Sequence, residues 1–260
     1  MRELQDRVSV IMPAYNAARY LEESVSSVLA QTWQNLELII IEDASQDETW
    51  ELANTLAKRD ERIRILRNPN NLGAARSRNR GVQAAKGEWI AFLDSDDVWK
   101  PEKLTEQLAF AHHRQAVFTF TGSAFMDADG QCRKYCLTVP EKVGYRQLLK
   151  QNIISCSSVL IRRSLILEYP MEHSGFLHED FAVWLRILKE KHLYAYGLNQ
   201  PLLIYRVSSA SSSGNKWKAA QMTFRVYHYI GLPLAEALYY WLCYTKRSFF
   251  KYRNLKKKQR

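Results

Sequence analysis

Clusters of carboxylates follow short apolar segments at separate places in this chain. Glu42 and Asp43 come directly after the apolar residues 36–41, and the segment Asp-Ser-Asp-Asp at 94–97 comes directly after the apolar residues 89–93. Carboxylates that lie close together repel one another, so a cation usually neutralises them. In an open α/β sheet, the carboxyl ends of the strands also form the crevice where ligands bind. The pattern therefore favours a divalent cation, Mn²⁺ or Mg²⁺, that carries a phosphorylated ligand at this edge.

Asp94, Ser95 and Asp96 form the sharpest of these clusters. A turn at the end of a strand can direct both carboxylates into one crevice, where hard cations bind oxygen ligands and bridge to substrate phosphates. The alternative is an aspartate-rich turn that caps the following helix, and for these three residues alone both interpretations stay open. The equivalent position of Glu42 and Asp43 after another strand favours the binding site.

Pro13, Tyr15 and Asn16 follow the first predicted strand. A nucleobase can stack on the ring of Tyr15, Asn16 offers amide donors and acceptors, and Asp43 can accept a hydrogen bond from a ring N–H. The alternative for this segment is a polar turn with a half-buried tyrosine. The segment by itself does not decide between them.

Arg78 lies in a segment, residues 71–81, that combines three arginines with glycine and alanine. A guanidinium can bind phosphate or offset the carboxylates, and the small residues permit a close approach. The alternative is a solvated arginine on a helix surface. The sequence has neither the glycine fingerprint of a dinucleotide site nor a P-loop, which argues against nicotinamide binding and P-loop chemistry.

A third acidic pair, Glu179 and Asp180, follows the apolar residues 176–177 and opens a predicted helix over residues 179–189. An acidic residue in the first turn of a helix is favourable by itself, because it interacts with the helix dipole. If Asp180 faces the same crevice as the other carboxylates, it is a candidate general base for a substrate hydroxyl.

Strand-like and helix-like runs alternate through the first half of the chain. Short connections between them predict an α/β fold with a mostly parallel sheet flanked by helices. Strands are expected at residues 8–12, 36–41, 63–66, 89–93 and 116–120, and helices at 19–30, 74–85, 101–113 and from a capping box at Ser45 and Glu48 to about 58. Beyond residue 121 we expect a hairpin at 125–138 turning at Asp129 and Gly130, strands at 157–161 and 202–205, and a flexible loop at 208–214.

Basic residues are concentrated at the C-terminal end of the sequence. The 260 residues have a formal net charge of +10, and residues 246–260 carry eight Lys or Arg and no acid, which leaves about +2 elsewhere. This distribution argues against a nucleic-acid-binding body. The four cysteines lack the spacing of a disulfide scaffold or a zinc site and are expected to be reduced. The first residues lack the apolar stretch of a secretory signal.

Residues 216–260 are rich in Tyr and Trp ahead of this basic cluster. Charged and helix-breaking residues interrupt their apolar run, which argues against a membrane span. An aromatic helix followed by Lys and Arg suits the anionic surface of a membrane, whereas the alternative is a helix packed on the domain with a solvated basic end. The apolar residues at helical spacing are Leu234, Leu238, Trp241, Leu242 and Phe249.

Taken together, these motifs resemble the family 2 glycosyltransferases of GT-A fold. The resemblance implies an inverting transferase that uses a nucleotide-diphosphate sugar, most often UDP-linked, with Mn²⁺ or Mg²⁺. We expect a nucleotide-sugar-binding half at residues 1–121, an acceptor half of the same domain at 122–215 and a helical basic segment at 216–260. The resemblance covers about residues 8–210 and rests on the ordered set VSVIMPAYN, IIIEDASQDET, NLGAARSRNRG, GEWIAFLDSDDVWKPEKL, SCSSVLIRRS, LHEDFAVWLRI and LIYR.

The resemblance also implies roles for matching positions. Residues 13–15 and Asp43 would hold the nucleobase, and Arg78 would help to shape the nucleotide site. Asp94 would face the ribose or the sugar, Asp96 would bind the metal, and Asp180 would be the general base. Asn16, Glu42 and Ser95 complete the expected donor site, and the expected acceptor-side residues are Ser157, Ser158, Glu179 and Trp184.

Two positions depart from the family's usual pattern. Ala44 stands where a glycine usually follows a pair of acids, although Glu42 keeps the charge of the first acid. Ser208 stands where many relatives carry a histidine, which puts a contact to the metal or the diphosphate in question.

We therefore expect a cytoplasmic glycosyltransferase, peripheral on the inner face of the cytoplasmic membrane, that builds a cell-surface polysaccharide on a glycan or lipid-linked acceptor. A metal-dependent sugar-phosphate nucleotidyltransferase is a second hypothesis, disfavoured because no glycine-rich basic loop follows the first strand. A non-catalytic binding module of the same fold is a third hypothesis. Carboxylates at positions 43, 94, 96 and 180 disfavour it.

Overall fold

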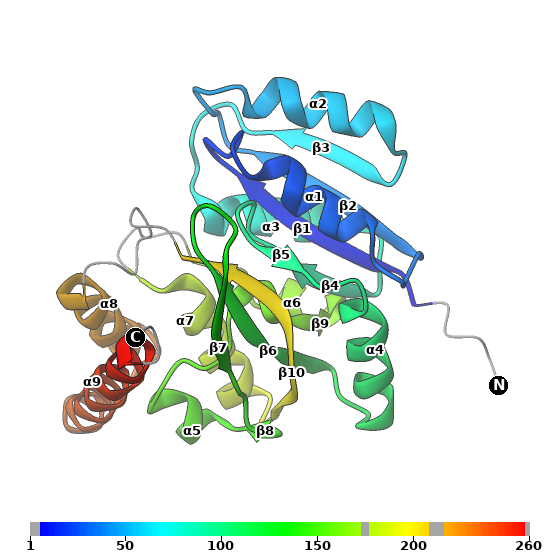
Figure 1. Ribbon diagram of the computed structural model, residues 1–260. Coiled ribbons are helices and arrows are strands. Elements are labelled where there is room, and N and C mark those ends of the chain that lie inside the picture. Colours follow the sequence, from blue (N-terminus) through cyan, green and yellow to red (C-terminus); the bar gives the residue numbers. More distant parts are fainter. Residues whose placement is uncertain (1–5, 173–176, 208–215, 258–260) are drawn as a thin grey trace.

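One central β-sheet organises the part of the chain that the structure describes (Figure 1). The computed structural model describes residues 6–172, 177–207 and 216–257. The strands are β1 (Val8–Ala14), β2 (Leu36–Glu42), β3 (Ile63–Arg67), β4 (Trp89–Phe92), β5 (Val98–Trp99), β6 (Phe118–Met126), β7 (Cys132–Leu137), β8 (Lys142–Val143), β9 (Leu160–Arg162) and β10 (Ala195–Arg206). Their order is β3-β2-β1-β4-β9-β6-β10-β5, with β7 paired to β6 and β8 to β10.

The N-terminal half of the sheet is parallel. Val8 of β1 lies opposite Leu36 of β2 on one side and Trp89 of β4 on the other. β1 and β2 consist largely of β-branched and other apolar residues, and every residue of β2 is buried, as expected for central strands that are covered on both faces. Because the strands run in the same direction, the carboxyl ends of β1, β2 and β4 meet at one edge.

The sheet becomes mixed beyond β4. β9 lies antiparallel between β4 and β6, so the strand expected at residues 157–161 enters the middle of the sheet. β10 then runs parallel to β6, and Ile204 near its end pairs with Val98 of β5. The α/β fold is confirmed, and the parallel arrangement holds for the half of the sheet in which helices connect successive strands.

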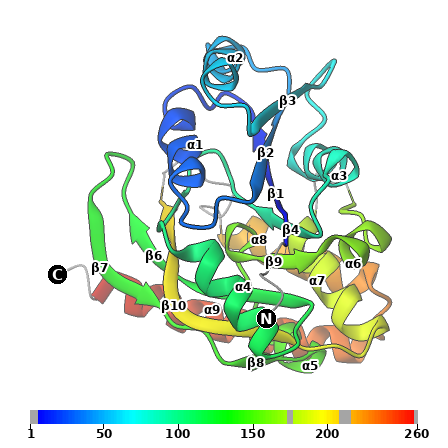
Figure 2. The same ribbon diagram turned by 90° about the vertical axis from the view of Figure 1, so that its right-hand side faces the viewer.

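Helices cover both faces of the sheet (Figure 2). α1, α2 and α4 contribute to one apolar core and α3, α6, α7, α8 and α9 to the other. α1 packs on the sheet through one apolar face. The helical spacing of its residues places Leu21, Val25 and Val28 together on this buried face. The helices are α1 (Leu21–Leu29), α2 (Thr49–Arg59), α3 (Ala74–Ala84), α4 (Lys103–His113), α5 (Tyr145–Leu149), α6 (Arg163–Glu168), α7 (Glu179–Glu190), α8 (Lys216–Tyr229) and α9 (Leu234–Lys257), with a 3₁₀ turn at Cys156–Ser158.

The C-terminal segment forms two helices that turn at Gly231, which has a φ of 72°. α8 packs on α7, and α9 packs on α8, where the indole of Trp241 donates a hydrogen bond of 2.8 Å to the Ala220 carbonyl. No helix among the described residues is both long enough and apolar enough to cross a membrane.

Several local expectations need correction. α2 begins at Thr49, and no side chain caps it, so the capping box at Ser45 and Glu48 does not form. The apolar pair 176–177 was expected to lead into Glu179 and Asp180, and of this pair the structure describes Leu177. Leu177 does not belong to a strand.

The hairpin expected at 125–138 is confirmed, since β7 pairs with the end of β6. The loop at 208–214 lies outside the described residues.

Gly81 of α3 sets how closely that helix approaches the sheet. A Cβ at this position would lie 2.5 Å from Ile11 Cγ2 and 2.7 Å from Ile41 Cδ1. Contacts this short require either the helix or the side chains of Ile11 and Ile41 to move in a closely packed core.

We therefore expect Gly81→Ala to lower the free energy of unfolding by about 1–3 kcal/mol, because overpacking outweighs the better helix propensity of alanine. Denaturant unfolding measures the change. Gln83→Ala, on the exposed face of the same helix, is the control and should stay within about 0.5 kcal/mol of the parent. An equally stable Gly81→Ala protein would contradict the close approach.

Candidate functional site

The acidic segment 94–97 forms a tight turn after β4. The Asp97 backbone N–H donates a hydrogen bond of 3.0 Å to the Asp94 carbonyl. The Asp94 N–H donates to the hydroxyl of Ser157 at 3.2 Å, and the Ser24 hydroxyl donates to the Ser95 carbonyl at 2.9 Å. The turn is therefore fixed from two sides, by α1 and by the 3₁₀ turn that precedes β9.

Arg78 of α3 provides the positive charge at this turn. Its Nη2 lies 2.5 Å from Asp94 Oδ1, and its side chain is only 10% exposed. Although burial opposes it, the negative charge of Asp94, with smaller contributions from Cys156 and Asp180, raises the pKa of Arg78. The Nε of Arg78 is buried and has no hydrogen-bond partner among the described residues.

Asp96 and Asp97 are carboxyls whose ionisation is disfavoured in the folded protein. Burial, followed by the charge of Asp94, raises the pKa of Asp96 to about 6. The same two effects, joined by the charge of Asp96, raise the pKa of Asp97 well above its usual range. Excess negative charge at this turn is the situation that a bound cation would relieve.

Asp180 at the start of α7 belongs to the same electrostatic environment. Burial raises its pKa, the charges of His178 and Arg78 oppose that shift, and Asp94 adds to it. Arg78, Asp94 and Asp180 therefore lie near one another, although they come from α3, the turn after β4 and α7. Burial also raises the pKa of the neighbouring Glu179, with a further contribution from Asp180.

The loops after β1 and β2 lie at the same edge of the sheet. Tyr15 is 45% exposed and presents its ring to solvent. Asn16, with a φ of 48°, accepts a hydrogen bond of 2.9 Å from Gln46 N–H through its side-chain oxygen. Its own N–H donates to the Ser45 hydroxyl, so the two loops are joined beside Tyr15. Pro13 pairs with Ile41 at the end of β1.

Asp43 braces the loop before α3. Its Oδ1 accepts hydrogen bonds from the Asn68 amide at 2.6 Å and from Leu72 N–H at 2.8 Å, and its Oδ2 accepts one from Gly73 N–H at 2.8 Å. Asn68 also donates to the Ser77 hydroxyl, one residue before Arg78. From the sequence, Asp43 was expected to contact a nucleobase. In the structure, its carboxylate holds the loop that leads into α3, the helix that carries Arg78.

Glu42 is fully buried and stabilises its own loop. Its carboxylate accepts hydrogen bonds from Ser45 N–H at 2.6 Å and from Arg67 Nε at 3.1 Å. Ala44 between them has a φ of 57°. This left-handed conformation explains why glycine is usual at that position, since a Cβ there is unfavourable.

Three expected acceptor-side residues have other surroundings. Trp184 is fully buried and packs against Phe92 and Phe118, which corrects its assignment to the acceptor side. Ser157 and Ser158 are also buried: Ser157 supports Asp94, and Ser158 donates to the Ser155 carbonyl. The sequence could not distinguish the two positions for Trp184. A helix whose first residues lie at a site can still direct its apolar residues into the core, as α7 does.

Arg206 at the end of β10 connects the acidic turn to two distant elements, and sequence reasoning gave it no role. Its Nε donates a hydrogen bond of 2.8 Å to the Asp96 carbonyl, and its backbone N–H donates one of 3.0 Å to Asp97 Oδ1. Its Nη2 lies 2.5 Å from Glu23 of α1, with the guanidinium 1% exposed. The only feature of the sequence that could have pointed to Arg206 was its place at the end of the motif LIYR.

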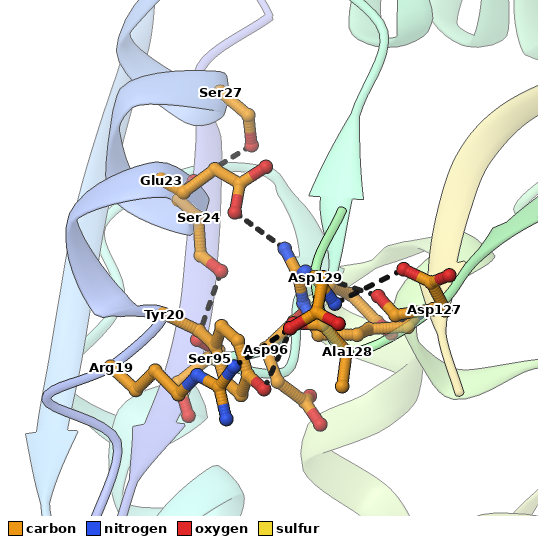
Figure 3. Close-up of polar contacts among 12 residues, drawn as sticks. Arg19, Tyr20, Glu23, Ser24, Ser27, Ser95, Asp96, Asp127, Ala128 and Asp129 are labelled. Carbon is orange, nitrogen blue, oxygen red and sulfur yellow. Dashed lines mark hydrogen bonds and ion pairs between the residues drawn. The ribbon is translucent and has the colours of Figure 1, made fainter. Parts of the chain in front are cut away.

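The tip of the β6–β7 hairpin lies against the same cluster (Figure 3). The guanidinium of Arg206 stacks 4.3 Å from the centre of the Tyr20 ring, and the Tyr20 hydroxyl donates to the Ala128 carbonyl at 3.2 Å. Arg19 and Asp129 form an exposed ion pair at 3.1 Å. These contacts hold the hairpin tip beside the turn that carries Asp96.

The residues at the acidic turn fit a hard divalent cation if phosphate oxygens of a bound substrate and water complete the coordination of the cation. Among the described residues, no three His, Cys, Asp or Glu side chains cluster as a complete metal site. Mn²⁺ and Mg²⁺ sites commonly use one or two carboxylates together with substrate phosphates and water. Asp96, beside Asp94 and the positive Arg78, matches that arrangement. Position 208 lies outside the described residues.

Comparison with known sequences identifies the family. The model of "Glycosyl transferase family 2" matches residues 9–166. TuaG of Bacillus subtilis (strain 168), named as a glycosyltransferase for teichuronic acid biosynthesis, is 41% identical over 242 residues, covering 93% of this chain and 95% of its own length. WfgD of Escherichia coli, named as a UDP-Glc:alpha-D-GlcNAc-diphosphoundecaprenol beta-1,3-glucosyltransferase, is 36% identical over 257 residues, covering 96% and 98%.

Solved structures agree with this fold. TarS residues 1–349 of S. aureus in complex with UDP-GlcNAc superposes with a TM-score of 0.69 at 18% identity, covering 89% of this chain and 69% of TarS. PcManGT, a mannosyltransferase of Pyrobaculum calidifontis in complex with GDP-Man and Mn²⁺, gives a TM-score of 0.65 at 16% identity, covering 88% and 65%. With a family model over more than half of its length and relatives that match nearly all of it, this chain belongs to glycosyl transferase family 2 and is a glycosyltransferase of GT-A fold.

Proposed function

We propose that this enzyme transfers a sugar from a UDP-sugar to a hydroxyl of a lipid-linked glycan, with inversion at the anomeric carbon and with Mn²⁺ or Mg²⁺. The observation that carries the proposal is the meeting of Arg78, Asp94, Asp96 and Asp180 at one edge of the sheet. Three of these groups suit the donor, and the fourth suits the acceptor.

On the donor side, Asp96 would hold the cation, and Arg78 would donate to a phosphate oxygen through its free Nε. When bound, the cation neutralises the negative charge that grows on the diphosphate leaving group. Asp94 is fixed by Arg78 and would face the ribose or the sugar. Tyr15 is exposed beside Asn16 and would stack on the base. TarS bound to UDP-GlcNAc and PcManGT bound to GDP-Man and Mn²⁺ support this donor class.

On the acceptor side, Asp180 would accept the proton of the attacking hydroxyl. Burial raises its pKa, which makes its ionised form a better proton acceptor than an exposed carboxylate. The positive Arg78 keeps that shift in check. Attack opposite to the departing diphosphate gives inversion in a single displacement.

The relatives and the tail support a lipid-linked acceptor and a location at the membrane surface. WfgD and WfaP of Escherichia coli are both named for a diphosphoundecaprenol-linked acceptor. TuaG is named for teichuronic acid biosynthesis. The basic residues 246–260 suit the anionic inner face of the cytoplasmic membrane, where such an acceptor would be reached from the cytoplasm.

Asp96→Asn tests the metal role. In the parent protein, Mn²⁺ with the correct UDP-sugar should raise Tm by mass action, and a screen of UDP-, GDP- and dTDP-sugars identifies that donor. The variant should lose this shift and at least about 10²-fold in turnover. Unchanged Mn²⁺-dependent binding would exclude Asp96 as a ligand.

Asp96→Asn should also raise the stability of the metal-free protein at neutral pH. Because the folded-state pKa of Asp96 is raised to about 6, its ionised form costs stability as pH rises from about 4 to above 6. Asp96→Asn should therefore stabilise the metal-free protein at pH 7 by about 1–2 kcal/mol and have no such effect at pH 4.

Asp180→Asn separates transfer from donor binding. The amide cannot accept the proton, so transfer should fall by about 10²–10⁴-fold while the donor-induced Tm shift stays. Glu190→Gln, at the exposed far end of the same helix, is the matched control for a change of charge. Transfer at the parental rate in Asp180→Asn would rule out Asp180 as the base.

Arg206→Lys tests the cluster that holds the acidic turn. A lysine keeps the charge but cannot contact the Asp96 carbonyl, Glu23 and the Tyr20 ring together. We expect affinity for UDP with Mn²⁺ to fall by about 10–100-fold, as for other supporting contacts of a metal site. Arg19→Lys, at the exposed ion pair of the same cluster, should change it little. Parental affinity in Arg206→Lys would contradict the positioning role.

A further inference from the structure

α9 exposes a continuous apolar stripe to solvent. Leu234, Leu238 and Leu242 recur every fourth residue and so share one face of the helix. They are 68%, 44% and 62% exposed, and Tyr239 beside them is 55% exposed. These four residues are called the α9 stripe below. Contiguous exposed apolar residues of this size mark a binding surface more often than ordinary solvent-facing helix.

The opposite face of α9 is already used. Ala237 is buried, and Tyr240, Trp241 and Tyr244 pack on the apolar core. The hydrogen bond from Trp241 to α8 fixes the rotation of the helix. The α9 stripe therefore cannot turn inward, and its exposure is a consequence of how the helix is anchored.

Charge indicates the chemistry of the partner. Lys246 and Arg247 are exposed one turn beyond Leu242, and the sequence from 237 to 260 contains no Asp or Glu. A surface that is apolar at one end and basic at the other matches the boundary of an anionic bilayer, with its acyl chains and its phosphate groups. We propose that the α9 stripe docks this enzyme on an anionic lipid surface.

Docking there would place the catalytic end of α7 close to the lipid. The ring of Phe181, the residue after Asp180, lies 5.8 Å from the ring of Tyr244 on the inner face of α9. It also lies 6.3 Å from the ring of Tyr227 on α8. The first turn of α7 is thus packed on α8 and on α9, the helix that would rest on the membrane. This link to a lipid-linked acceptor rests on the proposed function, whereas the lipid contact of the stripe does not.

The experiment measures co-sedimentation of the full chain with vesicles. Phosphatidylcholine vesicles containing phosphatidylglycerol are compared with vesicles of phosphatidylcholine alone. The parent should bind the anionic vesicles, and added salt should weaken binding. The double variant Leu238→Gln, Leu242→Gln should bind the anionic vesicles at least about 10-fold more weakly, because it removes two of the residues that enter the acyl boundary.

The control is Leu167→Gln on α6, an exposed leucine (40%) that lies outside the stripe and should bind as the parent does. A second arm, Lys246→Gln with Arg247→Gln, removes two of the eight basic residues of 246–260 and should weaken the preference for phosphatidylglycerol. Parental vesicle binding by the Leu238, Leu242 double variant would overturn the proposal. A parental dimer that this double variant dissociates would overturn it too, because a second copy would then cover the stripe.

The Tm shift with Mn²⁺ and the UDP-sugar is measured on the same samples. It should be the same in the parent and in the α9 stripe variants, because the stripe is not part of the donor site. A chain that binds vesicles but shows no donor-induced shift would refute the proposed donor chemistry and leave the docking surface standing. The reverse result would refute the docking surface alone.

Discussion

The buried negative charge at the end of β4 is the constraint on which the rest of the site depends. Asp94, Asp96 and Asp97 follow one another within a single turn, and Asp180 faces the same region. Within the described residues, Arg78 is committed to Asp94, and the guanidinium of Arg206 is committed to Glu23. The remaining carboxyls have raised pKa values, so the protein stores an unfavourable charge distribution that a bound cation would relieve.

Much of the surrounding structure serves to hold this charge in place. Asp43 braces the loop that leads to Arg78, and Ser157 receives the Asp94 N–H. Arg206 ties the carbonyl of Asp96 to α1 and to the hairpin tip. Each contact joins segments far apart in the sequence, so the position of the acidic turn is a property of the whole sheet.

The two halves of the sheet contribute differently. The parallel half, β3-β2-β1-β4, brings the loops after β1, β2 and β4 to one edge. The mixed half brings β9, β10 and the start of α7 to the same edge from the other direction. α8 and α9 then pack behind α7, which connects the end of that helix that carries Asp180 to an outward apolar surface.

Sequence by itself determined the features that depend on neighbours along the chain. Alternating apolar runs gave the strands and helices of the first half, and the acidic segment 94–97 at a strand end indicated the site, because parallel strands end at one edge. The hairpin turn at Asp129 and Gly130 was equally local.

Tertiary structure alone decided which partner each side chain meets. Trp184 faces the core, and Asp43 binds the backbone of the loop before α3. β9 enters the sheet between β4 and β6, and Arg206 contacts the acidic turn. The stripe on α9 is exposed because Trp241 and Tyr244 fix the other face. Local periodicity indicates where apolar and charged residues fall along an element. Burial and pairing depend on contacts between segments far apart along the chain, which only folding brings together.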